Sequence, residues 1–417
     1  MRHLKNALLI LTIGLLLSAC HPHDNRTDKR VIETGKALMS PTDLKASDYF
    51  SEISYVPLET TDSCLIGDAP EVCLLDNYIL VTTPMQQCFL FDKKTGKFKR
   101  QIGHVGNDPG GYSNADCIVD EQNERLLFYG WNHELIAYGL DGNYLGKIKI
   151  PAVSDAHPES CFCLNEDTII GYYRNMLGKD ANRMLYFKED GEQVALFPNE
   201  RICPDFEINR ISVWKGESAV KEFGPVARRG GIYMEGQDPE TANVIFPGNS
   251  NLWNAGGRTY LKEPFNDTIF QVQGTSIVPY LLFDNGELAW EYPDRFRKEK
   301  SKGIFITQVM DSERYLFCSA ITHLYNKEKR KTYTVAFDKM NGDTRVSPCE
   351  KGITDDLNGF LSLHPQTVSR VGEYGGLFSA EEIADRLGEY PQAEVPKSLD
   401  VLREVKDEQN PVVVIMR

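Results

Sequence analysis

Two Cys and His patterns in the chain have the residue types of metal chemistry but not its spacing. His133-Glu134 begins like His-Glu-x-x-His, the zinc motif of metalloproteases, yet Ala137 stands where the second His is needed. Cys161-Phe-Cys163 lies near His157, but zinc sites generally place two or more residues between paired Cys ligands, and no second His/Cys pair follows. We therefore predict no metal site and no cofactor.

Linear motifs of catalysis are also missing from the sequence. It contains neither a Gly-x-Ser-x-Gly nucleophile elbow nor the Gly-x-x-x-x-Gly-Lys-Ser/Thr phosphate-binding loop. Asp355 and Asp356 resemble half of a calcium loop, but Thr354 and Pro365 occupy its first and twelfth positions. We interpret the two Asp residues as a turn or helix cap, and the missing motifs favour a protein that is not an enzyme.

Cys20 is the residue with the most definite predicted chemistry. Arg2 and Lys5 precede an apolar run over residues 7–17, which is too short for the roughly 20 residues of a membrane-spanning helix. The run ends in Leu17-Ser18-Ala19-Cys20, which matches the lipobox of bacterial lipoproteins. The sequence thus predicts that residues 1–19 are a signal peptide and that Cys20 carries acyl chains such as palmitate. Several acyl chains on one residue give stable membrane anchoring.

The polar, charge-mixed stretch after Cys20 predicts a flexible tether over residues 20–48. His21, rather than Asp, follows the lipidated Cys and resembles lipoproteins that are sent on to the outer membrane. We expect an outer-membrane lipoprotein of the cell envelope; its orientation, towards the periplasm or the cell surface, stays open.

Composition excludes some partners. The chain has 46 Lys and Arg against 60 Asp and Glu, a net charge of −14, which argues against nucleic acid and anionic lipid as partners. Ten Cys leave nine besides Cys20, in a compartment that permits disulfides. Because they are scattered and most lie in strand-like segments, as Cys73, Cys88 and Cys318 do, we interpret them as small buried residues and leave any pairing open.

Short β-branched and aromatic runs separated by Asp, Asn and Gly predict an all-β fold between residues 55 and 350. Asp92, Asp141 and Asp190 stand at equal intervals of 49 residues in tight turns between strand-like runs, which suggests a repeated four-stranded propeller blade. The expected hairpins pair residues 88–92 with 97–102, 135–138 with 144–148, 184–187 with 193–197, 268–272 with 276–278, and 333–337 with 344–346.

A propeller must close, because a gap would leave unpaired edge strands. We predict that residues 54–58 pair with 410–417 in a shared last blade, so that residues 49–417 form one six-bladed β-propeller domain. Residues 200–257 are either a long insertion or a degenerate blade. Ser379 and Glu382 form a capping box that begins the one expected helical segment, near the C-terminus.

The sequence resembles two related groups. Residues 102–150 look like one repeat of the NHL type, carried by Gly103–Tyr112, Ile118–Asp120, Leu126–Phe128, Ile136–Tyr138 and Asp141–Leu145. Residues 50–417 are similar to the six-bladed β-propeller lipoproteins of Gram-negative gut bacteria, through Tyr55–Leu58, the Gly-rich loop, Asn266–Phe270, Thr354–Leu357 and Asn410–Val414. This resemblance implies six blades and a lipid anchor, and it implies little about chemistry.

Candidate binding residues follow from blade geometry, because the loops between strands two and three and between blades meet on one face. We expect residues 83–87 and the inter-blade segment 107–112 there. Aromatic, amide, His and Arg groups on this face could bind a sugar or a peptide. The candidates are Trp131, Asn132, His133, Arg174, Asn175, His323 and Tyr325.

The preferred hypothesis is a lipid-anchored binding or scaffold module that holds a glycan, a peptide or an envelope protein through this loop face. The alternative is an enzyme of the propeller lyase, lactonase or esterase type with its site in the central channel, since propellers assemble sites from separate loops. A third hypothesis is a structural subunit of an envelope assembly, suggested by the poorly repeating 200–257 segment with its Trp214 and Trp253.

Overall fold

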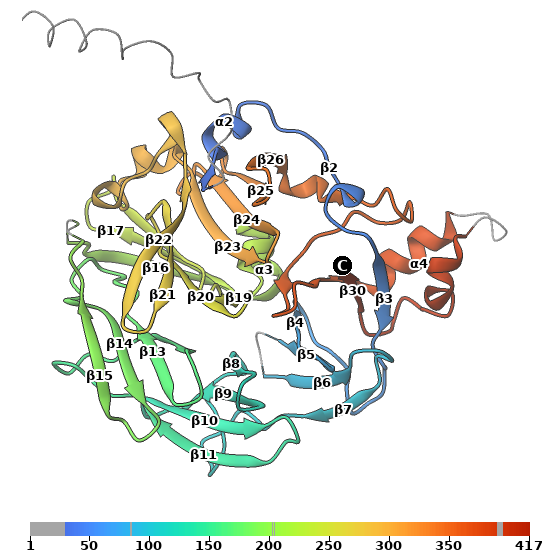
Figure 1. Cartoon of the computed structure of the whole chain (residues 1–417), viewed down its shortest axis with the longest axis horizontal. Coiled ribbons are helices and arrows are strands. Elements are labelled where there is room, and N and C mark those ends of the chain that lie inside the picture. Colours follow the sequence, from blue (N-terminus) through green and yellow to red (C-terminus); the bar gives the residue numbers. More distant parts are fainter. Residues whose placement is uncertain (1–29, 84–85, 202, 204, 390–394) are drawn as a thin grey trace, which may run out of the picture.

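A computed structural model describes residues 30–83, 86–201, 203, 205–389 and 395–417 of the chain. The signal peptide and the lipidation site at Cys20 lie outside these residues. Among the described residues, no helix is both long enough and apolar enough to span a membrane. Figure 1 shows antiparallel sheets that follow one another in chain order around the molecule, a propeller-like arrangement.

Five sheets each contain four consecutive antiparallel strands in chain order. Their strands are β4 (Glu71–Leu74), β5 (Tyr78–Thr82), β6 (Cys88–Asp92) and β7 (Phe98–Gln101); β8 (Cys117–Asp120), β9 (Arg125–Tyr129), β10 (Glu134–Gly139) and β11 (Tyr144–Lys149); β12 (Ser160–Cys163), β13 (Thr168–Tyr172), β14 (Asn182–Lys188) and β15 (Gln193–Pro198); β19 (Leu252–Ala255), β20 (Arg258–Lys262), β21 (Thr268–Gln273) and β22 (Ser276–Phe283); β23 (Phe305–Asp311), β24 (Tyr315–Thr322), β25 (Lys331–Asp338) and β26 (Asp343–Pro348). All five predicted hairpins are confirmed as β6–β7, β10–β11, β14–β15, β21–β22 and β25–β26.

The repeated turns form because side chain and backbone act together. The Oδ1 atoms of Asp92, Asp141 and Asp190 accept hydrogen bonds from backbone N–H groups two or three residues later, at 3.0, 2.9 and 2.9 Å. A Gly with positive φ follows each Asp, at +67°, +86° and +89°, in a conformation that other residues rarely adopt. Each turn therefore fixes the register of the hairpin it joins.

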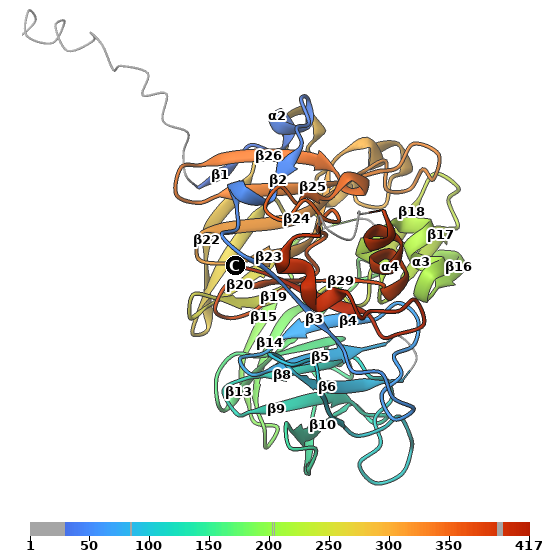
Figure 2. The same cartoon turned by 90° about the vertical axis from the view of Figure 1, so that its right-hand side faces the viewer.

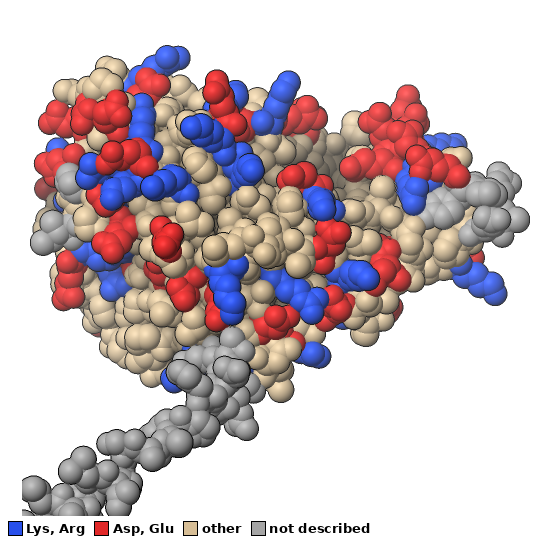
Figure 3. Space-filling model, turned by 90° about the horizontal axis from the view of Figure 1, so that it is seen from above, with Lys and Arg blue, Asp and Glu red and all other residues tan. Residues whose placement is uncertain are grey.

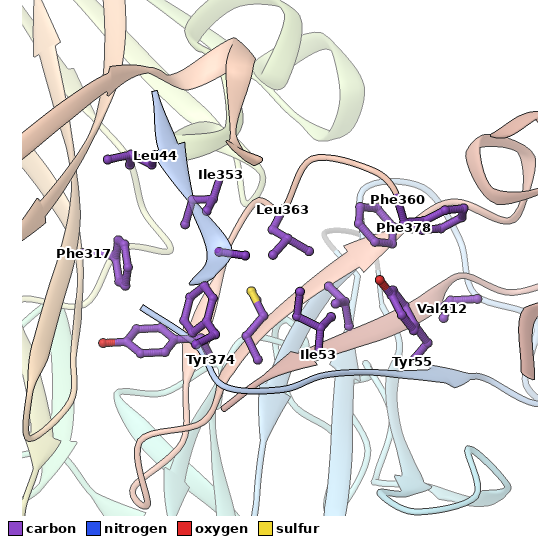
Figure 4. Packing of buried hydrophobic residues seen from close by; sticks show 14 of the residues in the cluster. Leu44, Ile53, Tyr55, Phe317, Ile353, Phe360, Leu363, Tyr374, Phe378 and Val412 are labelled. Carbon is purple, nitrogen blue, oxygen red and sulfur yellow. The ribbon is translucent and has the colours of Figure 1, made fainter. Parts of the chain in front are cut away.

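Another four-stranded sheet joins the two ends of the described chain. Its order is β28 (Thr367–Val368), β29 (Tyr374–Phe378), β30 (Val412–Met416) and β3 (Ile53–Pro57). β3 pairs antiparallel with β30 from Ile53 opposite Met416 to Pro57 opposite Val412, as the sequence predicts. Figure 4 shows the apolar cluster beside this sheet, where Tyr374, Phe378 and Val412 lie in one core with Phe317 of β24.

The predicted tether is wrong in its second half, because residues 30–48 pack on the sheets. β1 (Val31–Ile32) adds a parallel strand to β22, and α2 (Thr34–Leu38) follows it. β2 (Leu44–Lys45) pairs with β27 (Ile353–Thr354). Ile32 and Leu44 are fully buried, and this burial holds the segment against the domain although its composition is polar.

The segment over residues 200–257 contains an added three-stranded sheet rather than a four-stranded repeat. β16 (Ile208–Trp214), β17 (Gly231–Gly236) and β18 (Ala242–Ile245) form this sheet, and α3 (Gly216–Phe223) connects β16 to β17. We call residues 208–250 the insertion. In Figure 2, β16–β18, α3 and α4 lie together on one side of the molecule.

The predicted helix near the C-terminus is confirmed as α4 (Ala380–Gly388), and the Ser379–Glu382 capping box is formed. The expectation of a single helical segment was wrong, since α2 and α3 are also helical. α3 was missed because it is short and surrounded by β-like sequence. Short 3₁₀ segments complete the described elements: η1 (Ala46–Asp48), η2 (Pro225–Ala227), η3 (Gly286–Leu288), η4 (Tyr292–Asp294), η5 (Lys298–Lys302), η6 (Cys349–Lys351) and η7 (Lys397–Leu402).

Candidate functional site

A cavity of about 980 Å³ lies among the sheets. Its walls include an edge strand from each of six sheets: β4, β8, β12, β19, β23 and β28. The residues that precede these strands, such as Asp116, Glu159 and Gln366, line one end of the cavity, and the residues that follow them, such as Glu121 and Arg370, line the other. We call these the covered end and the opposite end.

The insertion covers one end of the cavity and is fixed there by polar contacts. Arg229 forms an ion pair with Glu71, the first residue of β4. Arg174 donates from its guanidinium to the Pro247 carbonyl at 2.8 Å, and Asn249 Nδ2 donates to Thr307 Oγ1 at 2.9 Å. The insertion thus contacts several sheets at once and forms a roof over the cavity.

Two carboxyl groups at the covered end are held away from water. Burial is the main cause that raises the pKa of Asp116, and the nearby Arg174 partly opposes it. Burial likewise raises the pKa of Glu159, whose Oε2 accepts a hydrogen bond from the backbone N–H of Arg174 at 3.0 Å. Proton uptake by these groups is therefore easier than in water, which is a property of many functional sites.

Three polar side chains that line the cavity have buried atoms without a hydrogen-bond partner in the described structure. They are Nε of Arg174, Nε of Arg228, and both amide atoms of Gln366. Buried polar groups in folded proteins are nearly always paired, so each such group calls for an explanation. Arg228 and Gln366 are considered further below.

Ion pairs join neighbouring sheets at the opposite end. Arg370, which follows β28, pairs with Asp76 and, at 3.1 Å, with Glu121. Asp76 follows β4 and Glu121 follows β8, so one guanidinium joins three sheets. The hydrogen bond with Arg370 is the main cause that lowers the pKa of Asp76.

The cavity walls combine apolar, aromatic, amide and hydroxyl groups. Phe162 and Trp253 lie on β12 and β19, and Tyr129 lies at the end of β9. Trp253 Nε1 donates to Asp311 Oδ2 at 3.2 Å, which fixes the indole ring. Amide and hydroxyl side chains surround these rings, among them Asn114, Asn249, Asn254, Gln122, Gln308, Ser160, Ser250, Thr82 and Thr259.

The cysteines in the cavity wall have suppressed reactivity. Burial raises the pKa of Cys73 and of Cys161 to about 12, so both thiols stay protonated at neutral pH and are poor nucleophiles. The prediction of small buried residues is confirmed for Cys88 and Cys318, while Cys73 is partly exposed to the cavity. The nine described cysteines are unpaired thiols.

Of the seven predicted binding residues, Arg174 lines the cavity. Trp131, Asn132 and His133 lie between β9 and β10, as expected, but outside the cavity wall. Trp131 is 56% exposed and donates to the Gly106 carbonyl at 2.7 Å. The His133 ring stacks on His157 with 3.8 Å between centroids.

The other predicted loop residues lie beside the insertion. Asn175 is buried and donates from Nδ2 to the Tyr292 hydroxyl at 2.7 Å. Tyr325 is buried in the same core as α3 and donates to the Arg295 carbonyl at 2.6 Å. Burial lowers the pKa of His323. Buried Asn175 and Tyr325 are therefore not available on an open loop face, because the insertion packs on their loops.

The Asp355-Asp356 motif forms a turn rather than a ligand site. Asp355 Oδ1 accepts backbone hydrogen bonds from Leu357 and Asn358 at 3.1 and 2.8 Å, which confirms the predicted turn. Over the described part of the chain, no group of three or more His, Cys, Asp or Glu residues is placed to hold a metal ion. In the view of Figure 3, Lys and Arg are interspersed with Asp and Glu on this face.

Sequence reasoning missed Arg228, Arg229 and Gln366 at the covered end. Gln366 could have been sought as the residue before a first strand, since the corresponding residues Asp116 and Glu159 also line the cavity. Arg228 and Arg229 carry no comparable signal, because they belong to the insertion and reach the cavity only through tertiary packing.

Comparison with solved structures supports the fold. The chain is similar to a Bacteroides fragilis protein described as a candidate exported protein, with a TM-score of 0.60, 17% identity, and coverage of 93% of this chain and 99% of that one. The WD40 repeats of RRP9 match with a TM-score of 0.36 and 8% identity over 90% of this chain and 99% of theirs, which is too weak to support a conclusion.

No curated protein matches the sequence significantly. The profile of one protein family, described as a domain of unknown function (DUF4934), matches residues 29–417. This match begins before β1 and includes β30, so it contains the cavity, the insertion and both paired ends of the described chain. The protein therefore belongs to the DUF4934 family.

Proposed function

We propose that this protein is a closed, six-bladed β-propeller that binds a small polar ligand in its central cavity, without chemical conversion. One observation carries the proposal: edge strands of six sheets line a single cavity of about 980 Å³. Ligand sites typically measure about 300–1,000 Å³ and combine apolar walls with a few polar groups. The pairing of β3 with β30 supports closure of the ring.

Cavity blocking tests this function. Val119 on β8 lines the cavity, so Val119→Trp should narrow it, whereas Val194→Trp adds the same bulk on the exposed outer strand β15. We expect ligands found by thermal-shift screening of saccharides and peptides to lose binding to the first variant and keep binding to the second. Equal binding to both variants would place the ligand elsewhere and contradict the proposal.

The same proposal includes a lipid anchor at Cys20 in the cell envelope, on the outer membrane. It is supported by the signal-like residues 1–19 and the lipobox. The similar Bacteroides fragilis protein, described as a candidate exported protein, agrees with this location. Cys20→Ser should remove acylation and release the protein from the membrane fraction; unchanged acyl labelling of the variant would contradict the anchor.

A second candidate function is hydrolysis or elimination of the bound ligand. It is favoured by Asp116 and Glu159, two cavity carboxyls whose pKa is raised by burial, as general acids often require. Mass spectrometry of the ligand after incubation separates the two functions. Conversion that Asp116→Asn or Glu159→Gln abolishes would favour the enzyme, whereas intact ligand favours the binding module.

A further inference from the structure

Arg228 is a cation at the covered end that forms no ion pair with any residue the structure describes. It follows η2 in the insertion and lines the cavity. Its Nε is buried without a hydrogen bond, while its neighbour Arg229 is paired with Glu71. Burial lowers the pKa of Arg228, and the charge of Glu382 partly opposes this shift. Glu382 forms no ion pair with Arg228 in the described structure. Burial of a charge without a partner is costly.

Gln366 lies at the same end with both polar atoms of its amide buried and unpaired. It directly precedes β28, and two residues earlier the pKa of His364 is lowered by burial first and then by the nearby charge of Arg228. The Nε of Arg228 and the amide of Gln366 thus line the same end without hydrogen-bond partners among the described residues.

The other charges at this end leave Arg228 uncompensated. Glu71 is paired with Arg229. Asp116 and Glu159 lie near Arg174 rather than Arg228 among the charges that act on them, and burial raises the pKa of both carboxyls. No carboxylate of the described residues forms an ion pair with Arg228, so its charge suits an anionic ligand.

The side chains of the cavity wall indicate which chemical class of anion would bind. A planar guanidinium binds carboxylate through two parallel hydrogen bonds, and an amide N–H₂ can donate to the same group. The aromatic rings of Phe162 and Trp253, surrounded by amide and hydroxyl groups, suit the faces and hydroxyl groups of sugars.

We propose that the ligand is an acidic saccharide whose carboxylate binds between Arg228 and Gln366 at the covered end. This inference rests on the proposed binding function and adds the ligand class and the residues that select it. The amide Nε2 of Gln366 donates to the carboxylate, and its Oε1 accepts from a ligand hydroxyl group.

Calorimetric titration of the mature chain with digalacturonate and with neutral galactobiose tests the inference. We expect digalacturonate to bind at least about tenfold more tightly, since a hydrogen bond to a charged group contributes about 1.5–3 kcal/mol. Arg228→Gln should remove this preference, because the affinity for digalacturonate should fall to about that for galactobiose. Arg258→Gln, at an exposed position of β20, is the matched control and should change neither affinity.

Gln366→Glu provides a test that keeps the folded state intact. The new carboxylate would balance Arg228 from within, so we expect an equal or higher melting temperature together with loss of the preference for digalacturonate. A preference that survives in either Arg228→Gln or Gln366→Glu would overturn the assignment of these residues.

The outcomes separate the inference from the function on which it rests. Equal binding of both saccharides inside the cavity, abolished by Val119→Trp, would overturn the acidic ligand and retain the binding function. Tighter binding of galactose 6-sulfate or of an oligoglutamate peptide than of digalacturonate would overturn the carboxylate-bearing saccharide. Failure of all these probes to bind would overturn both proposals.

Discussion

Each end of the central cavity has an arginine at its mouth, and the two arginines have opposite surroundings. At the opposite end, Arg370 pairs with Asp76 and Glu121 and joins three sheets, although its side chain is 54% exposed. At the covered end, Arg228, which belongs to the insertion, has its Nε buried and unpaired in the described structure. The same residue type joins three sheets at one end and has a buried atom without a described partner at the other.

This difference indicates that the fold uses the arginine at one end for stability and the arginine at the other end for ligand binding. An ion pair that is exposed to water adds little to the free energy of unfolding and requires little desolvation. Arg370 can therefore join three sheets without a large energetic penalty. An unpaired cation in a cavity lowers stability and gains its partner only when a ligand binds. Functional sites commonly retain such local conflicts, and the following variants test whether Arg228 is one of them.

Glu71→Gln should give the largest effect, because it leaves Arg229 partly buried without its partner. Side-chain exposures of 27% for Arg229 and 21% for Glu71 place the pair between surface and core. We expect a loss of about 2–3 kcal/mol of unfolding free energy, below the about 3–5 kcal/mol of fully buried pairs. Urea denaturation measures the loss; a change below about 0.5 kcal/mol would show that the roof does not depend on this pair.

Arg228→Met should stabilise the ligand-free protein by about 1–2 kcal/mol, since it removes a buried unsatisfied donor and keeps the side-chain volume. The measurement is the same denaturation experiment without added saccharide. Destabilisation by this substitution would mean that Arg228 has a structural partner and that the contrast between the two ends is false.

The pH dependence of stability should have opposite signs for carboxyls at the two ends. Asp116 and Glu159 have a pKa raised above their ordinary 3.8 and 4.5, so the stability linked to their protonation is present at low pH and is lost as pH rises through the raised pKa. The pKa of Asp76 is lowered below 3.8, so its contribution is present above 3.8 and is lost as pH falls through the lowered value.

Thermal unfolding from about pH 3 to about pH 8 checks these signs. The double variant Asp116→Asn, Glu159→Gln should gain stability over the wild type as pH rises, while Asp76→Asn should lose stability relative to the wild type as pH rises. Parallel pH profiles for both variants would contradict the different environments of the two ends.

Arg370→Met should have the smallest effect, at most about 1 kcal/mol of destabilisation, because its partners are accessible to water and screened by salt. Its sign is opposite to that of Arg228→Met, so the two substitutions form a matched pair. A loss well above 1 kcal/mol in high salt would show that Arg370 is a core element of ring closure rather than a surface clasp.

The parts of the fold that were predictable depend on interactions between residues close together in the sequence and on the pairing of strand edges. The Asp and Gly residues of the turns at Asp92, Asp141 and Asp190 fix their hairpins within a few residues, so alternation and turn chemistry suffice. The capping box of Ser379 and Glu382 is equally local. Pairing of the two chain ends was predictable because an unpaired sheet edge is unfavourable.

The candidate site was predictable only in outline. Loop positions followed from strand order, but Arg174 was the one predicted residue that lines the cavity; Asn175 and Tyr325 instead support the insertion. The burial of Ile32 and Leu44 in the expected tether was also missed, because a few apolar residues in a polar segment carry no periodic signal.

The sequence by itself determined the hairpins, their turns and the strands that meet at the two ends, since these depend on neighbours along the chain and on the need to pair strand edges. The tertiary structure alone decided that the insertion lies over the cavity and brings Arg228 to the same end as Gln366. These two residues are more than a hundred positions apart, and their common location arises from the packing of whole sheets rather than from local preference.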